Sequence, residues 1–140
     1  MTTRPIDVFF YGLFMDQAAL KAQGLTPSDP RIASVTGFKL HIGNRATLVP
    51  AQGGEVWGIV MGLPILQAET LYAEASVADY KPEPVLARLA DDEAAAALCY
   101  NLIDPGAGST NKDYAAALHA LAGRLGLPAN YVNFLSELAN

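Results

Sequence analysis

The sequence predicts an α+β domain built around a mixed, mostly antiparallel and strongly curved sheet. Stretches of strand-favouring residues dominate the first hundred residues and are broken by glycine and proline. One of them, residues 55–63, is nearly continuous apolar, as expected for a strand covered on both faces. Two stretches with apolar residues at helical spacing close the chain. The predicted order is strand, helix, several strands, one short helix, strands and then two helices.

Composition limits the size and the class of the protein. The chain has 140 residues, 51% of them hydrophobic, so we expect one compact domain over residues 1–140 with a real core. The net charge is −5, and the nine basic residues are scattered along the chain. Because no basic stripe occurs, we expect no nucleic-acid partner. No heptad pattern indicates a partner either, so both a monomer and a homodimer remain open.

The sequence shows no signal for secretion or for membrane insertion. No apolar run reaches 18 residues, and the N-terminus has no charged-then-apolar pattern. We therefore expect a soluble, cytoplasmic protein without a membrane partner. The lone cysteine, Cys99, lies in an apolar stretch and cannot form an internal disulfide. We expect it to face the core in a structural role.

The first predicted strand ends at a glycine that opens a turn. Residues 6–11 favour a strand, Gly12 breaks it, and residues 15–20 begin a helix. Asp16 is a suitable N-cap for that helix. A strand that turns into a helix start leaves several backbone N–H groups unpaired. The turn at Tyr11 and Gly12 is therefore either an ordinary turn after a core strand or a place that receives an anion.

The predicted strands continue after a proline-containing loop over residues 24–31. Residues 32–42 favour a long strand in which Gly37 indicates a bulge or a bend. A short strand over residues 46–49 and a glycine-rich turn over residues 52–54 then precede the continuous apolar strand.

Proline and acidic residues mark the next boundaries. Pro64 stops the apolar strand and can occupy the first turn of a helix over residues 65–73. Residues 77–84 contain two prolines and are predicted as a loop before a strand over residues 85–89. Residues 91–93 are acidic, and we expect a solvated hairpin tip there and no metal site.

A strand and two helices complete the predicted elements. Residues 94–103 contain alanines, which favour helix, but their larger apolar residues alternate as in a strand. After a loop over residues 104–111, a helix begins with Thr110 or Asn111 as its cap and ends at residues 126–128. A second amphipathic helix follows.

Motifs for metal, nucleotide and nucleophilic serine chemistry are missing from the sequence. His41 and His119 have no partner at ligand spacing and only one cysteine occurs, so we expect no zinc or other transition-metal site. Neither a glycine-rich phosphate-binding fingerprint nor a Gly-x-Ser-x-Gly motif is present. Carboxylates remain as the candidate acid–base groups.

Glu74 is the leading carboxylate. It follows a short apolar helix and lies among tyrosine and small residues. Such a carboxylate can be partly desolvated and poised as a general base, or it can simply face water at a helix end, as most glutamates do. Glu69 and Glu83 are weaker candidates, because they lie among polar or proline neighbours on faces predicted to be exposed.

Five segments of the sequence, taken in their order along the chain, together resemble the pattern of a known protein family. They are Tyr11-Gly12 after an apolar strand, residues 37–44, residues 46–60, Leu71-Tyr72-Ala73-Glu74 with Tyr80 six residues after the glutamate, and Tyr114 with Gly126-Leu127-Pro128-x-x-Tyr131. Over most of the chain this order resembles the γ-glutamylcyclotransferase family. The resemblance gives Glu74 the position of the family's catalytic glutamate.

The resemblance implies a small curved β-barrel flanked by helices and a reaction that needs no cofactor and no metal. The free α-amine of a small γ-glutamyl substrate attacks its own γ-glutamyl carbonyl, which gives 5-oxoproline and releases an amino acid, peptide or amine. Glu74 would take a proton from the attacking ammonium and return it to the leaving amine; one carboxylate can do both in a dry pocket. Because the ring closure is intramolecular, proximity lowers much of the barrier.

The resemblance also implies a pocket at the turn after the first strand. The loop Tyr11-Gly12-Leu13 would offer backbone N–H groups to the substrate carboxylate or to the developing oxyanion. Tyr114 would either contribute its hydroxyl to the pocket or pack in the core, and Tyr80 would lie at the pocket wall. The chain departs from the family where Leu13 and Phe14 replace Ser and Asn and where Ala75 replaces the glycine after the glutamate.

These departures leave three functions open. The first is a cyclotransferase that acts on a γ-glutamyl compound. The second is another enzyme of the same fold that acts on a γ-glutamylamine or a related small amide, and Leu13 with Phe14 indicates an apolar leaving side. The third is a non-catalytic protein that binds a small ligand in the same pocket and never forms 5-oxoproline.

Overall fold

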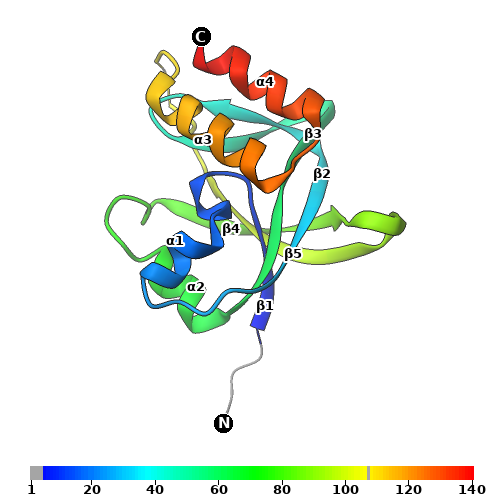
Figure 1. The fold of residues 1–140 in the computed structure, drawn as a ribbon. Coiled ribbons are helices and arrows are strands. Elements are labelled where there is room, and N and C mark those ends of the chain that lie inside the picture. Colours follow the sequence, from blue (N-terminus) through cyan, green and yellow to red (C-terminus); the bar gives the residue numbers. More distant parts are fainter. Residues whose placement is uncertain (1–4, 107) are drawn as a thin grey trace.

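Five strands close into a barrel, and helices flank it (Figure 1). The computed structural model describes residues 5–106 and 108–140. In chain order the elements are β1 (Pro5–Phe10), the 3₁₀ helix η1 (Leu13–Met15), α1 (Gln17–Ala22), β2 (Ser28–Ile42), β3 (Ala46–Pro64), α2 (Ile65–Leu71), β4 (Tyr80–Arg88), the 3₁₀ helix η2 (Ala90–Asp92), β5 (Ala94–Leu102), α3 (Lys112–Leu125) and α4 (Ala129–Ala139). The expected α+β class and the curved, mostly antiparallel barrel are both confirmed.

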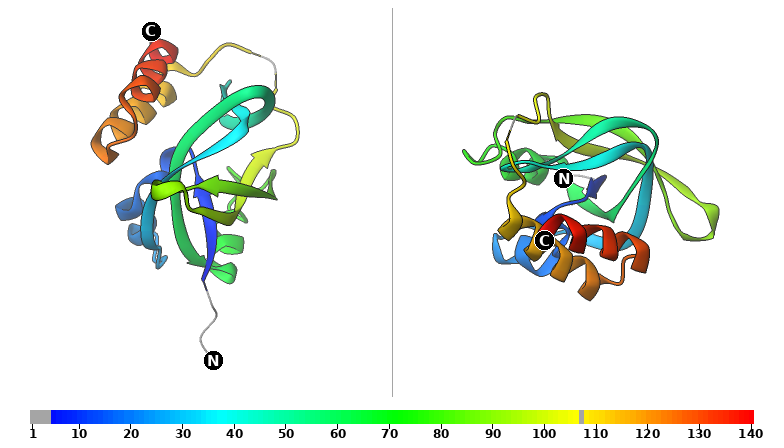
Figure 2. Two further views of the ribbon diagram at one scale, coloured as in Figure 1. Left: turned by 90° about the vertical axis from the view of Figure 1, so that its right-hand side faces the viewer. Right: turned by 90° about the horizontal axis from the view of Figure 1, so that it is seen from above.

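The barrel order is β1-β3-β2-β4-β5, and all but one of its strand pairs are antiparallel. The exception is the pairing of β1 with β5 at Val8 and Leu98, which is parallel and makes the sheet mixed. The pairing of β2 with β4 is short, since it consists of Ser34 opposite Arg88 alone. Helices α3 and α4 pack side by side over the barrel (Figures 1 and 2).

Strand β3 corrects the predicted turn over residues 52–54. The chain stays extended from Ala46 to Pro64, and Thr36 pairs with Glu55 while Phe38 pairs with Pro50. Residues 51–54 therefore form a bulge opposite Gly37, whose φ of +87° confirms the predicted irregularity there. The glycines bend a continuous hairpin and do not end a strand, because the bulge leaves the pairing on both sides intact.

Strand β4 corrects the predicted loop over residues 77–84. It begins at Tyr80 and runs through Pro82 and Pro84 while it pairs with β5. Proline is tolerated in a strand whose other edge is unpaired, and β4 meets β2 at a single residue pair. Strand β2 likewise begins at Ser28, inside the loop predicted over residues 24–31.

The predicted helix caps are confirmed. Asp16 Oδ1 accepts hydrogen bonds from the Ala18 N–H at 3.1 Å and the Ala19 N–H at 3.4 Å, and Asn111 Oδ1 accepts one from the Tyr114 N–H at 3.1 Å. The 3₁₀ turn at Leu13–Met15 was not predicted, and α2 ends at Leu71, short of the predicted residue 73. The caps fix where α1 and α3 begin, and so they set the approach of both helices to the turn after β1.

A buried polar cluster ties β3 to β5, which are not neighbours in the sheet. Thr47 Oγ1 accepts a hydrogen bond from the Leu102 N–H at 2.9 Å, and Asn101 Oδ1 accepts one from the Leu48 N–H at 3.2 Å. Asn101 also donates to the Glu83 carboxylate at 2.5 Å. Glu83 is therefore half-buried and hydrogen-bonded, contrary to the exposed face predicted for it.

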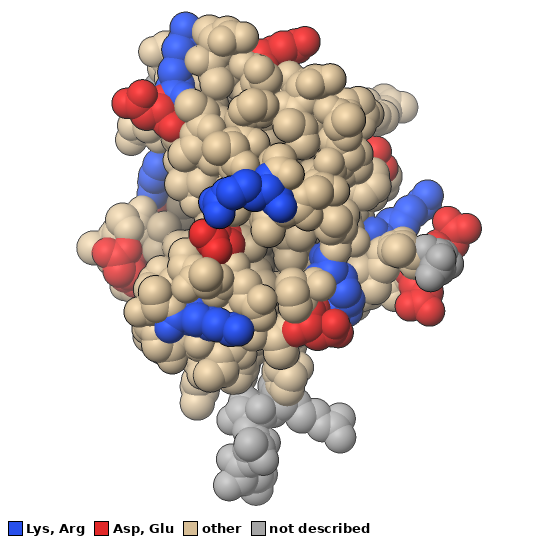
Figure 3. Space-filling view, viewed as in Figure 1, with Lys and Arg blue, Asp and Glu red and all other residues tan. Residues whose placement is uncertain are grey.

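The charged side chains form no continuous patch of one sign on the face of the molecule drawn in Figure 3, where Lys and Arg are interspersed with Asp and Glu. Within residues 5–106 and 108–140, none of the helices is both long enough and apolar enough to span a bilayer.

Candidate active site

A cavity of about 280 Å³ opens at the turn where β1 runs into η1. Its lining comes from the end of β1 with the turn after it, residues 45–46 where β3 begins, the segment from α2 to the first residue of β4, and single residues of β5 and α3. The lining residues are Phe9, Phe10, Tyr11, Gly12, Leu13, Phe14, Arg45, Ala46, Tyr72, Ser76, Val77, Tyr80, Tyr100 and Tyr114. Five separate parts of the chain thus meet at the feature that the sequence singled out.

Six of the seven residues expected at the site line this one cavity. They are Tyr11, Gly12, Leu13, Phe14, Tyr80 and Tyr114. The closed barrel brings them together, because the end of β1 lies beside β5 and the turn after it contacts α3. Glu74 is the expected site residue that does not line the cavity.

Gly12 is required by a close approach of Tyr114. The Tyr114 hydroxyl accepts a hydrogen bond from the Leu13 N–H at 3.3 Å, and it lies so near Gly12 that a Cβ there would collide with it. Of the N–H groups in the loop Tyr11-Gly12-Leu13, that of Leu13 is therefore already paired within the protein. Among the residues that the structure describes, none accepts a hydrogen bond from the Gly12 N–H. The Phe14 N–H likewise has no acceptor among the described residues, so these two N–H groups and the hydroxyl proton of Tyr114 are donors at the turn.

The cavity wall is mainly aromatic. The rings of Tyr72 and Tyr100 stack at 3.8 Å between centroids with an angle of 5° between their planes, and Phe14 meets Tyr72 edge-on at 5.8 Å. Burial raises the pKa of Tyr80 to about 12, and burial holds the pKa of Tyr11 and of Tyr72 well above the ordinary value of 10. These phenols therefore stay neutral at physiological pH and serve as hydrogen-bonding and packing groups, not as bases.

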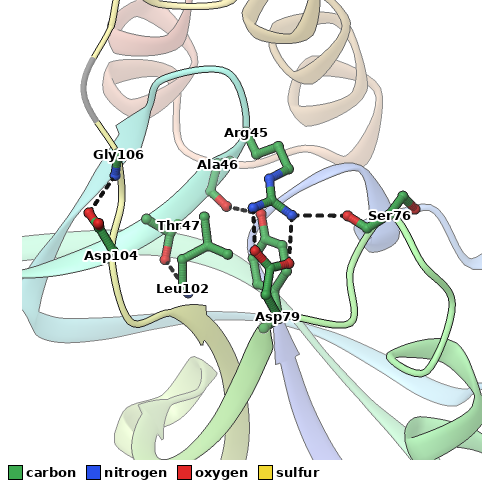
Figure 4. A network of polar contacts seen from close by, with 9 residues as sticks. Arg45, Ala46, Thr47, Ser76, Asp79, Leu102, Asp104 and Gly106 are labelled. Carbon is green, nitrogen blue, oxygen red and sulfur yellow. Dashed lines mark hydrogen bonds and ion pairs between the residues drawn. The ribbon is translucent and has the colours of Figure 1, made fainter.

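One ion pair lies at the rim of the cavity. Arg45 lines the cavity and meets the Asp79 carboxylate with two parallel hydrogen bonds of 2.7 and 2.6 Å (Figure 4). The hydrogen bonds and charge of Arg45 lower the pKa of Asp79 to about 2. Asp79 is therefore a poor proton acceptor at neutral pH. In the described part of the chain, no group of three or more His, Cys, Asp and Glu side chains could hold a metal ion.

Glu74 lies outside the cavity and faces water. Its side chain is exposed in the segment between α2 and β4, which agrees with the second of the two alternatives for Glu74, a carboxylate that faces water at a helix end. The Glu74 carboxylate accepts a hydrogen bond from the Ser76 hydroxyl, and Ser76 lines the cavity. Helix α2 ends three residues before Glu74, and the turns that follow carry the side chain outward. Glu74 thus lies at the rim of the cavity and is connected to its wall through Ser76.

Sequence reasoning missed the residues that complete the wall. Tyr100 could have been found, since it belongs to the alternating pattern of β5, and Tyr72 stands two residues before Glu74. Arg45 carries no local signal, because its partner Asp79 is 34 residues away. Only the folded barrel shows that these side chains share one cavity.

Comparison with known proteins finds the fold but no family model. No protein-family model and no curated protein matches the chain. Among solved structures, a γ-glutamyl cyclotransferase matches with a TM-score of 0.80 and 20% identity over 94% of this chain and 86% of that one. An uncharacterized protein from Homo sapiens matches with a TM-score of 0.79 and 20% identity, with the same coverage of 94% and 86%. An AIG2-like protein from Mus musculus matches with a TM-score of 0.62 and 13% identity over 76% of this chain and 81% of that one.

These likenesses agree with the family resemblance read from the sequence, and they show that the chain has the γ-glutamylcyclotransferase-like fold. At such low identity they say nothing about activity, because one fold hosts many functions.

Proposed function

We propose that the protein is a γ-glutamylcyclotransferase-like enzyme that converts a small γ-glutamyl compound into 5-oxoproline. The α-amine nitrogen of the substrate forms a bond to its own γ-carbonyl carbon, and the bond from that carbon to the leaving nitrogen breaks. The attacking ammonium loses two protons, and the leaving nitrogen gains two and departs as an ammonium. Atoms and charge balance without a co-reactant, since the reaction is an intramolecular exchange of one amide for another.

The cavity at the Tyr11-Gly12 turn is the observation that carries the proposal. Its volume of about 280 Å³ suits a small ligand. The Gly12 N–H and the Tyr114 hydroxyl are donors in a wall that is mainly aromatic. Donors fixed in an apolar surrounding stabilise a carboxylate or a developing oxyanion more strongly than water does.

Glu74 is the proposed general base and general acid. Its carboxylate is hydrogen-bonded to Ser76 on the cavity wall, so a change of side-chain rotamer carries it toward a bound ligand. Catalytic hydrogen bonds in unliganded enzymes are often not yet formed and tighten when substrate binds. A γ-glutamyl substrate in the cavity would cover Glu74 and exclude water from it, which suits a carboxylate that must first accept and then donate a proton.

The leaving side of the substrate is proposed to be apolar. Leu13 is 36% exposed at the cavity, and Phe14 and Tyr72 pack edge-to-face beside it. This wall favours a γ-glutamyl amino acid or amine with an apolar side chain over one with a charged side chain.

A second function, small-ligand binding without turnover, is favoured by one specific observation. Because Glu74 is exposed, no carboxylate lies among the described residues that line the cavity, and Leu13 and Phe14 stand where the family has Ser and Asn. A protein that binds and does not turn over would need the aromatic wall but not Glu74.

A panel of γ-glutamyl dipeptides and γ-glutamylamines, with 5-oxoproline as the readout, separates the two functions. We expect turnover by the wild type, loss of turnover in Glu74→Gln, and unchanged turnover in Glu69→Gln, which alters an exposed glutamate of α2. Full activity of a folded Glu74→Gln variant would rule out the proposed mechanism. Ligand binding by calorimetry with no 5-oxoproline from any compound would establish the binding function instead.

A further inference from the structure

The segment 72–79, which links α2 to β4, forms part of the cavity wall but has few attachments of its own. Four backbone hydrogen bonds shape it, from the Tyr72 N–H to Ala68, from the Ala73 N–H to Thr70, from the Val77 N–H to Glu74, and from the Tyr80 N–H to Val77. All four join residues three or four positions apart, so they set the shape of the segment and not its position on the barrel. Most of its residues are exposed. The Tyr72 ring, stacked on Tyr100, holds the first residue of the segment, and the residues after it need a further attachment.

Arg45 provides that attachment from the turn between β2 and β3. Its Nη1 donates to the Ser76 carbonyl at 3.0 Å and to Asp79 Oδ1 at 2.7 Å, and its Nη2 donates to Asp79 Oδ2 at 2.6 Å (Figure 4). The guanidinium carbon also lies 5.4 Å from the centre of the Tyr80 ring. One side chain thus contacts the segment at two residues and the first residue of β4 at a third.

The geometry makes this ion pair stronger than an ordinary surface pair. Isolated exposed ion pairs contribute little to stability, but a two-bond Arg–carboxylate contact fixes orientation as well as distance. The carbonyl of Ser76 adds a third hydrogen bond, and the ring of Tyr80 adds a cation–π contact. Hydrogen bonding to Asp79 also raises the pKa of Arg45 above its ordinary value.

We infer that Arg45 is a positioning residue, which clamps the segment 72–79 to the barrel and thereby sets Ser76 and Glu74 at the rim of the cavity. Arg45 holds the Ser76 carbonyl, and the hydroxyl of the same Ser76 holds the Glu74 carboxylate. Release of Arg45 frees Ser76 and Val77, both of which line the cavity, together with Glu74. The catalytic part of this inference rests on the proposed function.

Four variants test the clamp. Arg45→Met keeps an apolar stem and removes all the donors, Asp79→Asn keeps the shape and removes the charge, and the double variant removes both. Arg31→Met is the matched control, because it breaks the ion pair of Arg31 with Asp7 at 2.8 Å, away from the cavity. Hydrogen–deuterium exchange over residues 73–80, with α3 as internal reference, and steady-state kinetics on the most active γ-glutamyl compound are the two readouts.

We expect exchange over residues 73–80 to accelerate about tenfold or more in Arg45→Met, with α3 unchanged. We also expect kcat to fall about 100-fold and KM to change much less, because a small misplacement of a catalytic group acts mainly on the chemical step. Since the two partners act as a unit, the double variant should be no worse than the more damaging single variant. Arg31→Met should behave as the wild type in both measurements.

Two results would overturn the inference. If Arg45→Met exchanges over residues 73–80 at the wild-type rate, Arg45 does not hold the segment. If that exchange accelerates and kcat of an active enzyme stays at the wild-type value, the clamp does not position Glu74. If the wild type forms no 5-oxoproline, the proposed function is refuted. The hydrogen–deuterium exchange rate over residues 73–80 then decides by itself whether Arg45 clamps the segment.

Discussion

The contact between Gly12 and Tyr114 supports a sharp prediction about the turn after β1. Gly12 has φ −112° and ψ −152°, an extended conformation that alanine adopts without strain. The substitution Gly12→Ala is therefore harmful only through its Cβ, which would collide with the hydroxyl oxygen of Tyr114. The next atom that the Cβ would meet is Cζ of the same ring, at 3.8 Å, an ordinary van der Waals contact. Removal of one oxygen atom should thus relieve the whole clash.

The expected energies follow from these contacts. Overpacking of this kind costs about 1–3 kcal/mol of folding free energy. Tyr114→Phe loses the hydrogen bond from the Leu13 N–H, which is worth about 1 kcal/mol. Gly12→Ala alone should destabilise the protein by about 2 kcal/mol, and Tyr114→Phe alone by about 1 kcal/mol. The double variant should lose little more than Tyr114→Phe alone, because alanine then fits the vacated space.

Urea unfolding of the wild type, both single variants and the double variant measures this double-mutant cycle. Gly123→Ala is the matched control, since its Cβ would meet no atom within 4 Å on helix α3, and it should raise stability by about 0.5–1 kcal/mol. Equal destabilisation by Gly12→Ala in the wild-type and Tyr114→Phe backgrounds would refute the reasoning. Under the proposed function, Tyr114→Phe and the double variant should both reduce 5-oxoproline formation, because each removes the hydroxyl donor.

Three further predictions concern the buried polar cluster, the cysteine and the rim. Asn101→Ala leaves the buried Leu48 N–H without an acceptor and should cost about 1–3 kcal/mol in urea unfolding; an unchanged midpoint would contradict the role given to this amide. Burial raises the pKa of the Cys99 thiol to about 12, so at pH 8 the folded protein should react with a thiol reagent at least about 100-fold more slowly than the chain in urea, and equal rates would show that the thiol is accessible. Because the pKa of Asp79 is lowered to about 2 from 3.8, its bond to Arg45 should persist above pH 4 and be lost as the pH falls through about 2. An NMR titration of the Asp79 carboxyl carbon should show that midpoint, and Arg45→Met should move it back up; a wild-type midpoint near 3.8 would mean that the two side chains do not pair in solution.

The helix caps and the strand alternation were predictable because they depend on neighbours in the sequence. Asp16 and Asn111 bond backbone groups two or three residues away, so their chemistry is local. The strand at β5 was also predicted correctly against the helix preference of alanine, although its last four residues are buried on both faces. Gly37 was correctly predicted as an irregularity, since its positive φ is a property of one residue.

The wrong boundaries share one physical cause. Residues 52–54 and residues 80–84 contain glycine or proline, which usually break strands, yet both lie within strands. In β3 the bulge opposite Gly37 accommodates the glycines. In β4 the edge toward β2 is almost unpaired and therefore tolerates the prolines. Whether a residue breaks a strand thus depends on the partner strand, which the local sequence does not specify.

The features of the site can likewise be divided into those that the sequence predicts and those that depend on the tertiary structure. The sequence by itself determined the turn at Tyr11-Gly12, the elements around it and the segment that bears Glu74, because these follow from residue type and order. Only the tertiary structure decided that Tyr72 and Tyr100 stack in the cavity wall, that Arg45 reaches Asp79 across 34 residues, and that Glu74 lies exposed at the rim. Burial and pairing are set by barrel closure, which brings distant strands together. A local pattern therefore names the candidate residues, and the closed barrel fixes the surroundings that govern their chemistry.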